Sequence, residues 1–231
     1  MLGQRTEGRR PLLFGGRTME DIWAAKPRTT DAEIREFYRD LGAWLVFRQL
    51  YRHRRSRFSA IIKSVPRHGV LLEFGCGVAP VAWRLMHRLL YARAVIVDIP
   101  SAPIDFAEWR FRRAGLSDWV TPVRLEPGHH LPDPLSRVDV VTVLETFEHL
   151  ANPASMAAWI VNIQLQDGGM LWEDFIAVGA HPSGPDLATD TDRLATYREI
   201  RSACDLVSGV PPETPGGGGI RGWRHRGWRR P

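Results

Sequence analysis

The stretch Val70-Leu-Leu-Glu-Phe-Gly-Cys-Gly-Val-Ala79 carries the strongest fold signal in the sequence. Its first five residues form a short apolar segment typical of a buried strand, and a helical pattern follows at residues 81–90. Gly75 and Gly77 lack Cβ atoms, so the backbone between strand and helix can pass close beneath a ligand. This order predicts a ligand-binding βα unit, although a G-x-G pair alone is weak evidence.

Apolar strands and helices continue to alternate after this unit. We predict further strands at residues 94–97, 120–125, 138–144 and 170–178, and helices at residues 102–114, 155–166 and 190–203. Continuous apolar strands that alternate with helices indicate a parallel sheet covered on both faces. The predicted fold class is therefore α/β, with a doubly wound, mostly parallel sheet.

The residues before the first strand predict a helical extension. Thr30 or Asp31 can cap a helix, and the apolar side chains behind them recur at three- and four-residue spacing, which gives one buried stripe. The stripe consists of Ile34, Phe37, Leu41, Trp44, Leu45 and Leu50. A second helix is predicted at residues 55–64, ending before Pro66.

The net charge of +5 is unevenly distributed along the 231 residues. The last sixteen residues hold five arginines and no acid, so they account for the whole excess. A second basic cluster runs from Arg48 to Arg67 without Asp or Glu; such runs attract phosphates, although most are solvated faces. The basic composition is thus a property of one tail and not a sign of a nucleic-acid enzyme.

Cysteine content and hydropathy indicate the cellular compartment in which the protein is expected. Cys76 and Cys204 are too few for a disulfide framework and lack metal-ligand spacing, so we expect a reducing compartment and no metal. The first residues hold no signal-peptide core, and no stretch approaches the ~18–20 apolar residues of a membrane span. Composition excludes collagen, coiled coils and wholly disordered chains. We expect a cytoplasmic protein without a transmembrane segment.

An acid ends the second predicted strand. Asp98 lies 21 residues beyond Gly77, where a parallel fold brings a carboxylate to the same crevice. A carboxylate there can accept both hydroxyls of a ribose, so dinucleotide and S-adenosylmethionine enzymes both fit. A dinucleotide fingerprint needs a third small residue at position 80, which is Pro80. The pyrophosphate-binding interpretation is therefore weakened.

At these residues the sequence resembles the class I S-adenosylmethionine-dependent methyltransferases. Their first motif is an acid followed by G-x-G-x-G; Glu73, Gly75 and Gly77 match it, and Ala79 replaces the last glycine. The resemblance continues through Val95-Ile-Val-Asp98, Val138-Asp-Val-Val-Thr-Val-Leu-Glu-Thr-Phe-Glu-His-Leu150 and Asp167-Gly-Gly-Met-Leu-Trp172. Four matches in the family's order, over roughly residues 70–178, are jointly specific.

The resemblance implies a seven-stranded sheet that binds S-adenosyl-L-methionine and releases S-adenosyl-L-homocysteine. The cofactor-binding residues that it implies are Glu73, Gly75, Cys76, Gly77, Asp98, Ile99, Glu126 and Glu145. One position departs from the family. After strand three many relatives carry an acid that binds the adenine amino group, whereas here either Glu126 or the backbone must do so.

A sulfonium methyl group is already activated, so such an enzyme mainly aligns the acceptor, the methyl group and the sulfur. A base is needed only if the acceptor must lose a proton, and it works best with a pKa near the operating pH. The candidates at strand ends are Glu145, Glu148, His149, Glu173, Asp174 and His181. Of these we expect Glu145, His149 and His181 to be catalytic. Positioning suits His149 better than base chemistry, and His181 is as readily a solvated loop residue.

We therefore expect a methyltransferase that acts on a small-molecule acceptor, with O-methylation ahead of N- or C-methylation. Three alternatives stay open: a non-catalytic S-adenosylmethionine-binding regulatory partner, a nicotinamide-dependent oxidoreductase, and an RNA methyltransferase. The sequence holds no module that reads or stacks on nucleic acid, so a nucleic-acid partner is disfavoured. A homodimer is left open.

The expected domain organisation has four parts. Residues 1–18 form a flexible arm, residues 19–66 a helical lid or extension, and residues 67–215 the S-adenosylmethionine-binding domain. Residues 216–231 form a basic edge strand or a tail, where arginines would discourage pairing with another edge.

Overall fold

The computed structural model describes residues 16–17, 21–22, 25–26, 30–54, 58–87, 92–126, 137–175, 188–214 and 219–227. Seven strands form one sheet in the order β3-β2-β1-β4-β5-β7-β6. They are β1 (Val70–Phe74), β2 (Arg93–Asp98), β3 (Val120–Arg124), β4 (Val138–Val143), β5 (Leu165–Glu173), β6 (Cys204–Ser208) and β7 (Arg221–His225). β1 to β5 are parallel, and β7 is antiparallel to both neighbours. The predicted α/β class and mostly parallel seven-stranded sheet are confirmed.

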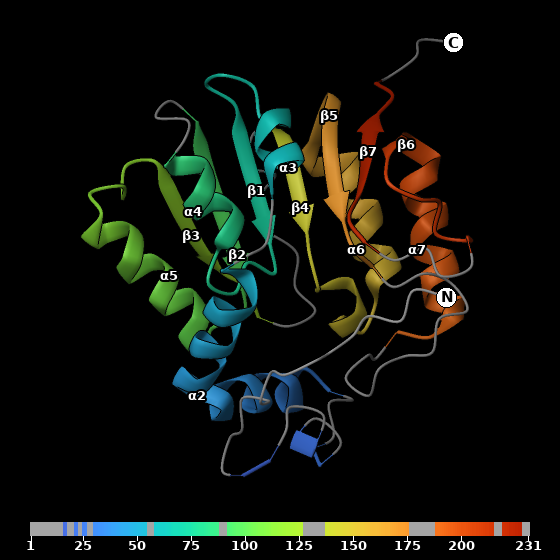
Figure 1. The fold of residues 1–231 in the computed structure, drawn as a ribbon. Coiled ribbons are helices and arrows are strands. Elements are labelled where there is room, and N and C mark those ends of the chain that lie inside the picture. The colour runs from blue at the N-terminus through green and yellow to red at the C-terminus, as the bar shows by residue number, and fades with distance from the viewer. Residues whose placement is uncertain are drawn as a thin grey trace, which may run out of the picture.

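Helices cover both faces of the sheet (Figure 1). One face packs against α3 (Ser59–Ser64), α4 (Pro80–Met86) and α5 (Ala102–Arg113). The other packs against α6 (Pro153–Trp159), the π-helical turn η2 (Ile160–Gln164) and α7 (Asp190–Ala203). Each face buries its own apolar cluster, which explains why the strand residues are apolar on both sides.

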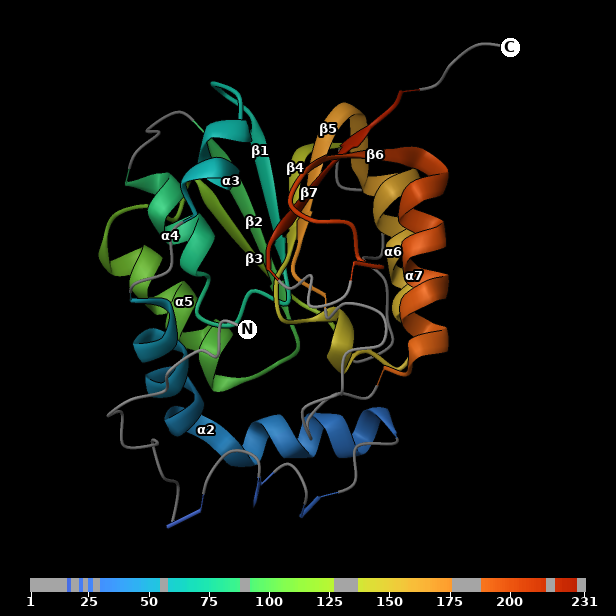
Figure 2. The same ribbon diagram turned by 45° about the vertical axis from the view of Figure 1, so that its right-hand side comes forward.

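The helical extension contains α2 (Asp31–His53), which lies across the carboxyl ends of the parallel strands (Figures 1 and 2). Thr30, one of the two expected caps, is the N-cap of this helix, and it forms a capping box with Glu33 that the sequence analysis did not predict. At Gly42 the backbone leaves the helical region (φ 47°, ψ −137°), and Figure 2 shows α2 bent sharply into two halves. The apolar spacing alone did not predict this bend. Among the described helices, none is both long and apolar enough to span a bilayer.

The C-terminal strand is not at the edge, so that expectation is wrong. β7 lies between β5 and β6, and β6 forms the edge of the sheet. Arg221 of β7 is only 1% exposed and faces Glu173 across the strand pair, so it cannot guard an edge. The order of strands is set by pairing between distant segments, which local patterning does not reveal.

The entry to β5 also differs from the expectation. The predicted strand starts at residue 170, but β5 begins at Leu165, so Asp167 to Gly169 lie inside the strand. The register against β4 shifts between Val138 and Val140, and this irregularity accommodates the glycines. The predicted continuation of the strand is wrong at residues 174–175, because β5 ends at Glu173, and residues 176–178 lie outside the described residues.

Candidate functional site

The two glycines of the first βα turn, Gly75 and Gly77, leave room for side chains from different parts of the chain. Both have positive φ, +66° at Gly75 and +51° at Gly77. A Cβ atom on Gly75 would lie 2.1 Å from Thr146 Oγ1, and Thr146 is itself held by a hydrogen bond to the Leu144 carbonyl. A Cβ atom on Gly77 would lie 2.4 Å from Oε1 of Gln49. The turn is therefore fitted both to the segment after β4 and to α2.

Glu73, at the end of β1, contacts the start of the helix that follows this turn. Its carboxylate accepts hydrogen bonds from the backbone N–H groups of Val81 (3.1 Å) and Ala82 (2.7 Å) in the first turn of α4. These N–H groups have no partner within the helix, so the buried side chain satisfies them. Burial raises the pKa of Glu73 to about 7, against the opposing effect of these N–H groups and Arg110. The buried side chain therefore orients the turn.

Asp98 connects the end of β2 to the glycine turn. Its Oδ2 accepts from the N–H of Gly77 at 2.5 Å, and its Oδ1 accepts from the N–H of Ile99 at 2.8 Å. Burial raises the pKa of Asp98 to about 6, and the two N–H groups oppose that rise. The carboxylate thus lies in the crevice beside β1, as the spacing of 21 residues predicted.

A pocket of about 130 Å³ opens at this point, and we call it the central pocket. It lies where strand order reverses between β1 and β4, which is the usual ligand site of open α/β sheets. Its lining comprises Ile34, Tyr38, Gln49, Gly75, Asp98, Ile99, Glu145, Thr146, His149, Leu150 and Ala151. Five of the predicted site residues are therefore brought together, namely Gly75, Asp98, Ile99, Glu145 and His149.

Other predicted site residues lie outside the lining. Cys76 is buried, and burial raises the pKa of its thiol, so it is not poised as a nucleophile. Gly77 faces Gln49, and the carboxylate of Glu126 forms an ion pair with Arg35 of α2 at 2.7 Å. His181 lies outside the described residues.

Of the lining residues that the sequence analysis did not predict, Gln49 and Thr146 contact the glycine turn. Gln49 of α2 accepts from the N–H of Val78 at 3.0 Å and so covers the glycine turn. Thr146 packs against Gly75. Thr146 belongs to the segment quoted for the fourth strand, whereas a lone glutamine in a helix carries no local signal.

Glu145 stands between the central pocket and a second one. Its φ of +50° is unusual for a residue other than glycine and indicates a backbone held by its surroundings. The N–H of Glu145 donates to Asp174 Oδ1 at 2.5 Å, and its carboxylate forms an ion pair with Arg52 of α2. α2 and the end of β5 therefore both hold this residue.

The second pocket, which we call the side pocket, has a volume of about 260 Å³. Arg52, His53, Phe58, Leu144, Glu145, Asp174 and Ile220 line it. Glu145 lines both pockets, so they adjoin at this residue. Burial, together with Arg52, Arg84 and Arg48, lowers the pKa of His53 to about 4, so its ring is neutral at neutral pH.

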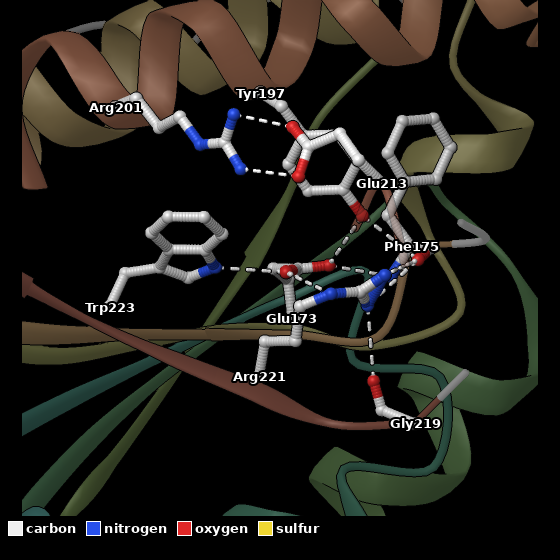
Figure 3. A network of polar contacts seen from close by, with 8 residues as sticks. All are labelled: Glu173, Phe175, Tyr197, Arg201, Glu213, Gly219, Arg221 and Trp223. Carbon is white, nitrogen blue, oxygen red and sulfur yellow. Dashed lines mark hydrogen bonds and ion pairs between the residues drawn. The ribbon is translucent and has the colours of Figure 1, made fainter. Parts of the chain in front are cut away.

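Glu173 had been a candidate base, and the structure contradicts this. The side chain is fully buried at the end of β5 (Figure 3). Its Oε1 accepts from Trp223 Nε1 at 2.9 Å, its Oε2 accepts from the N–H of Phe175 at 2.7 Å, and Arg221 Nε lies 3.7 Å from Oε1. Burial raises the pKa of Glu173, and Arg221 opposes the rise. The carboxylate is buried within the sheet and lines neither the central pocket nor the side pocket.

The same network fixes the backbone that follows β5. Arg221 donates two hydrogen bonds to the carbonyl of Phe175, at 2.9 and 3.1 Å, and the hydroxyl of Tyr197 donates a third at 3.0 Å (Figure 3). Phe175 directly follows Asp174, so these bonds also restrict the backbone of Asp174, whose carboxylate accepts from the N–H of Glu145. Among the described residues, no group of three or more His, Cys, Asp and Glu side chains could hold a metal ion.

Comparison with known proteins identifies the family to which this domain belongs. Residues 72–171 match a family model described as a methyltransferase domain. The chain carries a class I methyltransferase domain. The matched range begins in β1 and ends in β5, so it spans the glycine turn, Asp98 and Glu145. The enzyme is an S-adenosylmethionine-dependent methyltransferase, as the sequence resemblance implied. No curated protein matches the sequence.

Solved structures of similar fold support the architecture of this methyltransferase. The [4+2]-cyclase SpnF superimposes with a TM-score of 0.62 at 16% identity, covering 80% of this chain and 77% of that one. An O-methyltransferase family 2 protein from Planctomyces limnophilus gives 0.55 at 18% identity, covering 78% of this chain and 60% of that one. A SAM-dependent methyltransferase from Aquifex aeolicus gives 0.52 at 13% identity, covering 85% and 97%. At these identities the likeness concerns the fold alone.

Proposed function

We propose that this methyltransferase transfers a methyl group from S-adenosylmethionine to an oxygen atom of a small-molecule acceptor. The observation that carries the proposal is the pair of adjoining pockets on either side of Glu145. The central pocket holds a glycine turn and a carboxylate suited to a nucleoside, and the larger side pocket has both apolar and titratable walls. When bound, the donor supplies an activated sulfonium methyl group.

The central pocket fits the donor in its residue types. Asp98 would accept the ribose hydroxyls, because its carboxylate lies at the carboxyl end of β2 within the pocket lining. Gly75 has no Cβ atom where the backbone must approach the ligand, and Ile99 offers an apolar side chain beside the acid. His149 lines the same pocket, which suits the positioning role expected for it.

We also propose that residues 19–66 act as a lid over this pocket. Ile34, Tyr38 and Gln49 of α2 all contribute to the lining, and the pocket volume of about 130 Å³ lies below the ~300 Å³ at which ligand sites usually begin. The donor would therefore enter when α2 moves outward. The non-helical backbone at Gly42 gives α2 a place to bend, and no atom of the described residues lies within 4 Å of a Cβ atom built there.

An oxygen acceptor is supported by the side pocket. Closure by α2 would exclude water from the reacting atoms and align them, which is the main requirement of methyl transfer from a sulfonium. The side pocket supplies carboxylates from Glu145 and Asp174, which could take a hydroxyl proton. The O-methyltransferase among the structures of similar fold, solved with apigenin, agrees with this proposal.

The proposal is tested by incubating the protein with S-adenosylmethionine carrying an isotope-labelled methyl group. The acceptor panel should contain phenols, aliphatic alcohols, amines and compounds with acidic C–H bonds, and mass spectrometry should locate the label. We expect label on oxygen. Label on nitrogen or carbon would overturn the oxygen assignment, and S-adenosylhomocysteine binding without transfer to any acceptor would favour the non-catalytic alternative.

A further inference from the structure

The side pocket contains three titratable side chains that could act on a substrate, and only one suits proton removal. Glu145 is ion-paired with Arg52. His53 is neutral and a weak base, since its pKa is lowered to about 4. Asp174 remains. Its Oδ1 accepts from the N–H of Glu145, and among the described residues the structure assigns no hydrogen-bond partner to its Oδ2.

The position of Asp174 is held by its neighbours in the chain and by Glu145. The residue directly follows Glu173, the last residue of β5, and the backbone after it is held by Arg221 and Tyr197 through the carbonyl of Phe175. In front, Asp174 contacts Glu145, which lines the central pocket as well. The carboxylate of Asp174 therefore contacts Glu145, the residue at which the central pocket and the side pocket adjoin.

The charges around Asp174 favour a base that titrates near neutrality. Burial raises its pKa to about 7, and the charges of Glu145 and Glu173 reinforce the rise. The N–H of Glu145 and the charge of Arg52 oppose it. General bases are most effective when their pKa is close to the operating pH. Among the described residues that line the pocket, the Arg52–Glu145 ion pair and the neutral His53 carry no net charge, which suits an uncharged acceptor.

We propose that Asp174 is the general base of this methyltransferase and that the side pocket takes an acceptor with an acidic hydroxyl, a phenol or an enol. The proposal rests on the proposed methyl transfer to oxygen and names its base and substrate class. A phenol has a pKa of about 10, within reach of a carboxylate of this kind, whereas an aliphatic alcohol is a far weaker acid. Phe58, Leu144 and Ile220 supply apolar walls for the ring that carries the hydroxyl.

The proton and electron balance of the step is simple. Asp174 takes the hydroxyl proton, and an oxygen lone pair forms the new O–CH₃ bond. The bond between methyl carbon and sulfur breaks, and its electron pair stays on sulfur, which becomes a neutral thioether. Asp174 then releases the proton to solvent, so one proton appears for each methyl group transferred.

The test compares Asp174→Asn with the wild type on two phenols. Asparagine keeps an oxygen for the N–H of Glu145 but cannot take a proton. With 4-methylphenol, which is neutral at about pH 8, we expect kcat to fall at least ~100-fold. With 4-nitrophenol, largely ionised at that pH, we expect less than about a threefold loss. Wild-type kcat on 4-methylphenol should rise with pH and level off above about pH 7, and this rise should be absent in the variant.

Binding gives a readout that does not depend on turnover. Titration calorimetry should show S-adenosylhomocysteine affinity within about twofold of wild type in Asp174→Asn. Ile220→Trp should fill the side pocket and weaken 4-methylphenol binding to the S-adenosylhomocysteine complex at least tenfold. Val207→Trp places the same side chain on the exposed edge strand β6 and should change neither affinity. Asp118→Asn, an exposed aspartate outside both pockets, controls for the loss of one charge.

The outcomes separate this inference from the proposed function. If Asp174→Asn binds S-adenosylhomocysteine normally but keeps kcat on 4-methylphenol within about threefold of wild type, Asp174 is not the base. If the wild type methylates aliphatic alcohols but no phenol, the substrate class is wrong while O-methylation stands. If the wild type fails to bind S-adenosylhomocysteine at all, the proposed function fails together with the inference.

Discussion

The half of the sheet formed by β1, β2 and β4 and the half formed by β5, β7 and β6 are built in different ways. In the first, acids at strand ends contact nearby backbone: Glu73 caps the helix that begins seven residues later, and Asp98 binds Gly77 in the adjacent turn. In the second, Glu173 contacts Trp223 and Arg221, about fifty residues further along the chain. The first half is organised by a local motif, and the second by one buried polar network.

The largest effect is expected from breaking that network. Arg221→Met removes the charge that faces buried Glu173 and the donors to the Phe175 carbonyl, and we expect the free energy of unfolding to fall by about 3–5 kcal/mol. Denaturant unfolding measures this. Arg224→Met alters an exposed arginine of the same strand and should change stability by less than ~0.5 kcal/mol. Equal stability of the two variants would contradict the structural role given to Arg221.

The comparison of the two halves explains what the sequence could predict. Glu73, Gly75, Asp98 and Glu145 belong to motifs whose chemistry and spacing are readable within short segments, and their arrangement was predicted. The interior position of β7 was not, because strand order depends on which distant segments pair.

The side pocket was missed for a related reason. It joins α2, the end of β4, the end of β5 and Ile220, and no single segment contains its pattern. Asp174 was among the candidate bases, but its environment depends on burial and on Glu145, which only the fold provides.

The glycine turn offers the next effect in size. Gly75→Ala would force a Cβ atom against Thr146, whose side chain is buried and hydrogen-bonded, at a left-handed backbone position. We expect a loss of about 2–4 kcal/mol in unfolding free energy. Gly77→Ala meets only the end of the flexible Gln49 side chain, so a loss of about 1–2 kcal/mol is expected.

A second substitution checks the clash that we expect in Gly75→Ala. Thr146→Ala removes the two atoms closest to the new Cβ atom and should recover part of the stability lost in Gly75→Ala. If Gly77→Ala proves as costly as Gly75→Ala, the difference drawn between a fixed and a movable neighbour is incorrect.

The smallest effect is a pH dependence of donor-site affinity. Both oxygens of Asp98 can accept from the ribose hydroxyls at full strength only when the carboxyl is ionised, and burial raises the pKa of this carboxyl to about 6. Below about pH 6 the free protein holds a proton that binding must displace, so the Kd for S-adenosylhomocysteine should rise, approaching tenfold per pH unit. Above about pH 7 it should be constant. Calorimetry from pH 5 to 8 would show this, and Asp98→Asn should remove the slope.

The central claim is that the crevice between β1 and β4 is an S-adenosylmethionine site organised by Asp98, and one titration tests it most directly. At about pH 7.5, S-adenosylhomocysteine should bind the wild type with micromolar Kd, and NAD⁺ and NADP⁺ should not bind. Asp98→Ala should weaken binding at least tenfold, whereas Asp118→Ala should not. Binding of a nicotinamide cofactor in place of S-adenosylhomocysteine, or unchanged affinity in Asp98→Ala, would contradict the account.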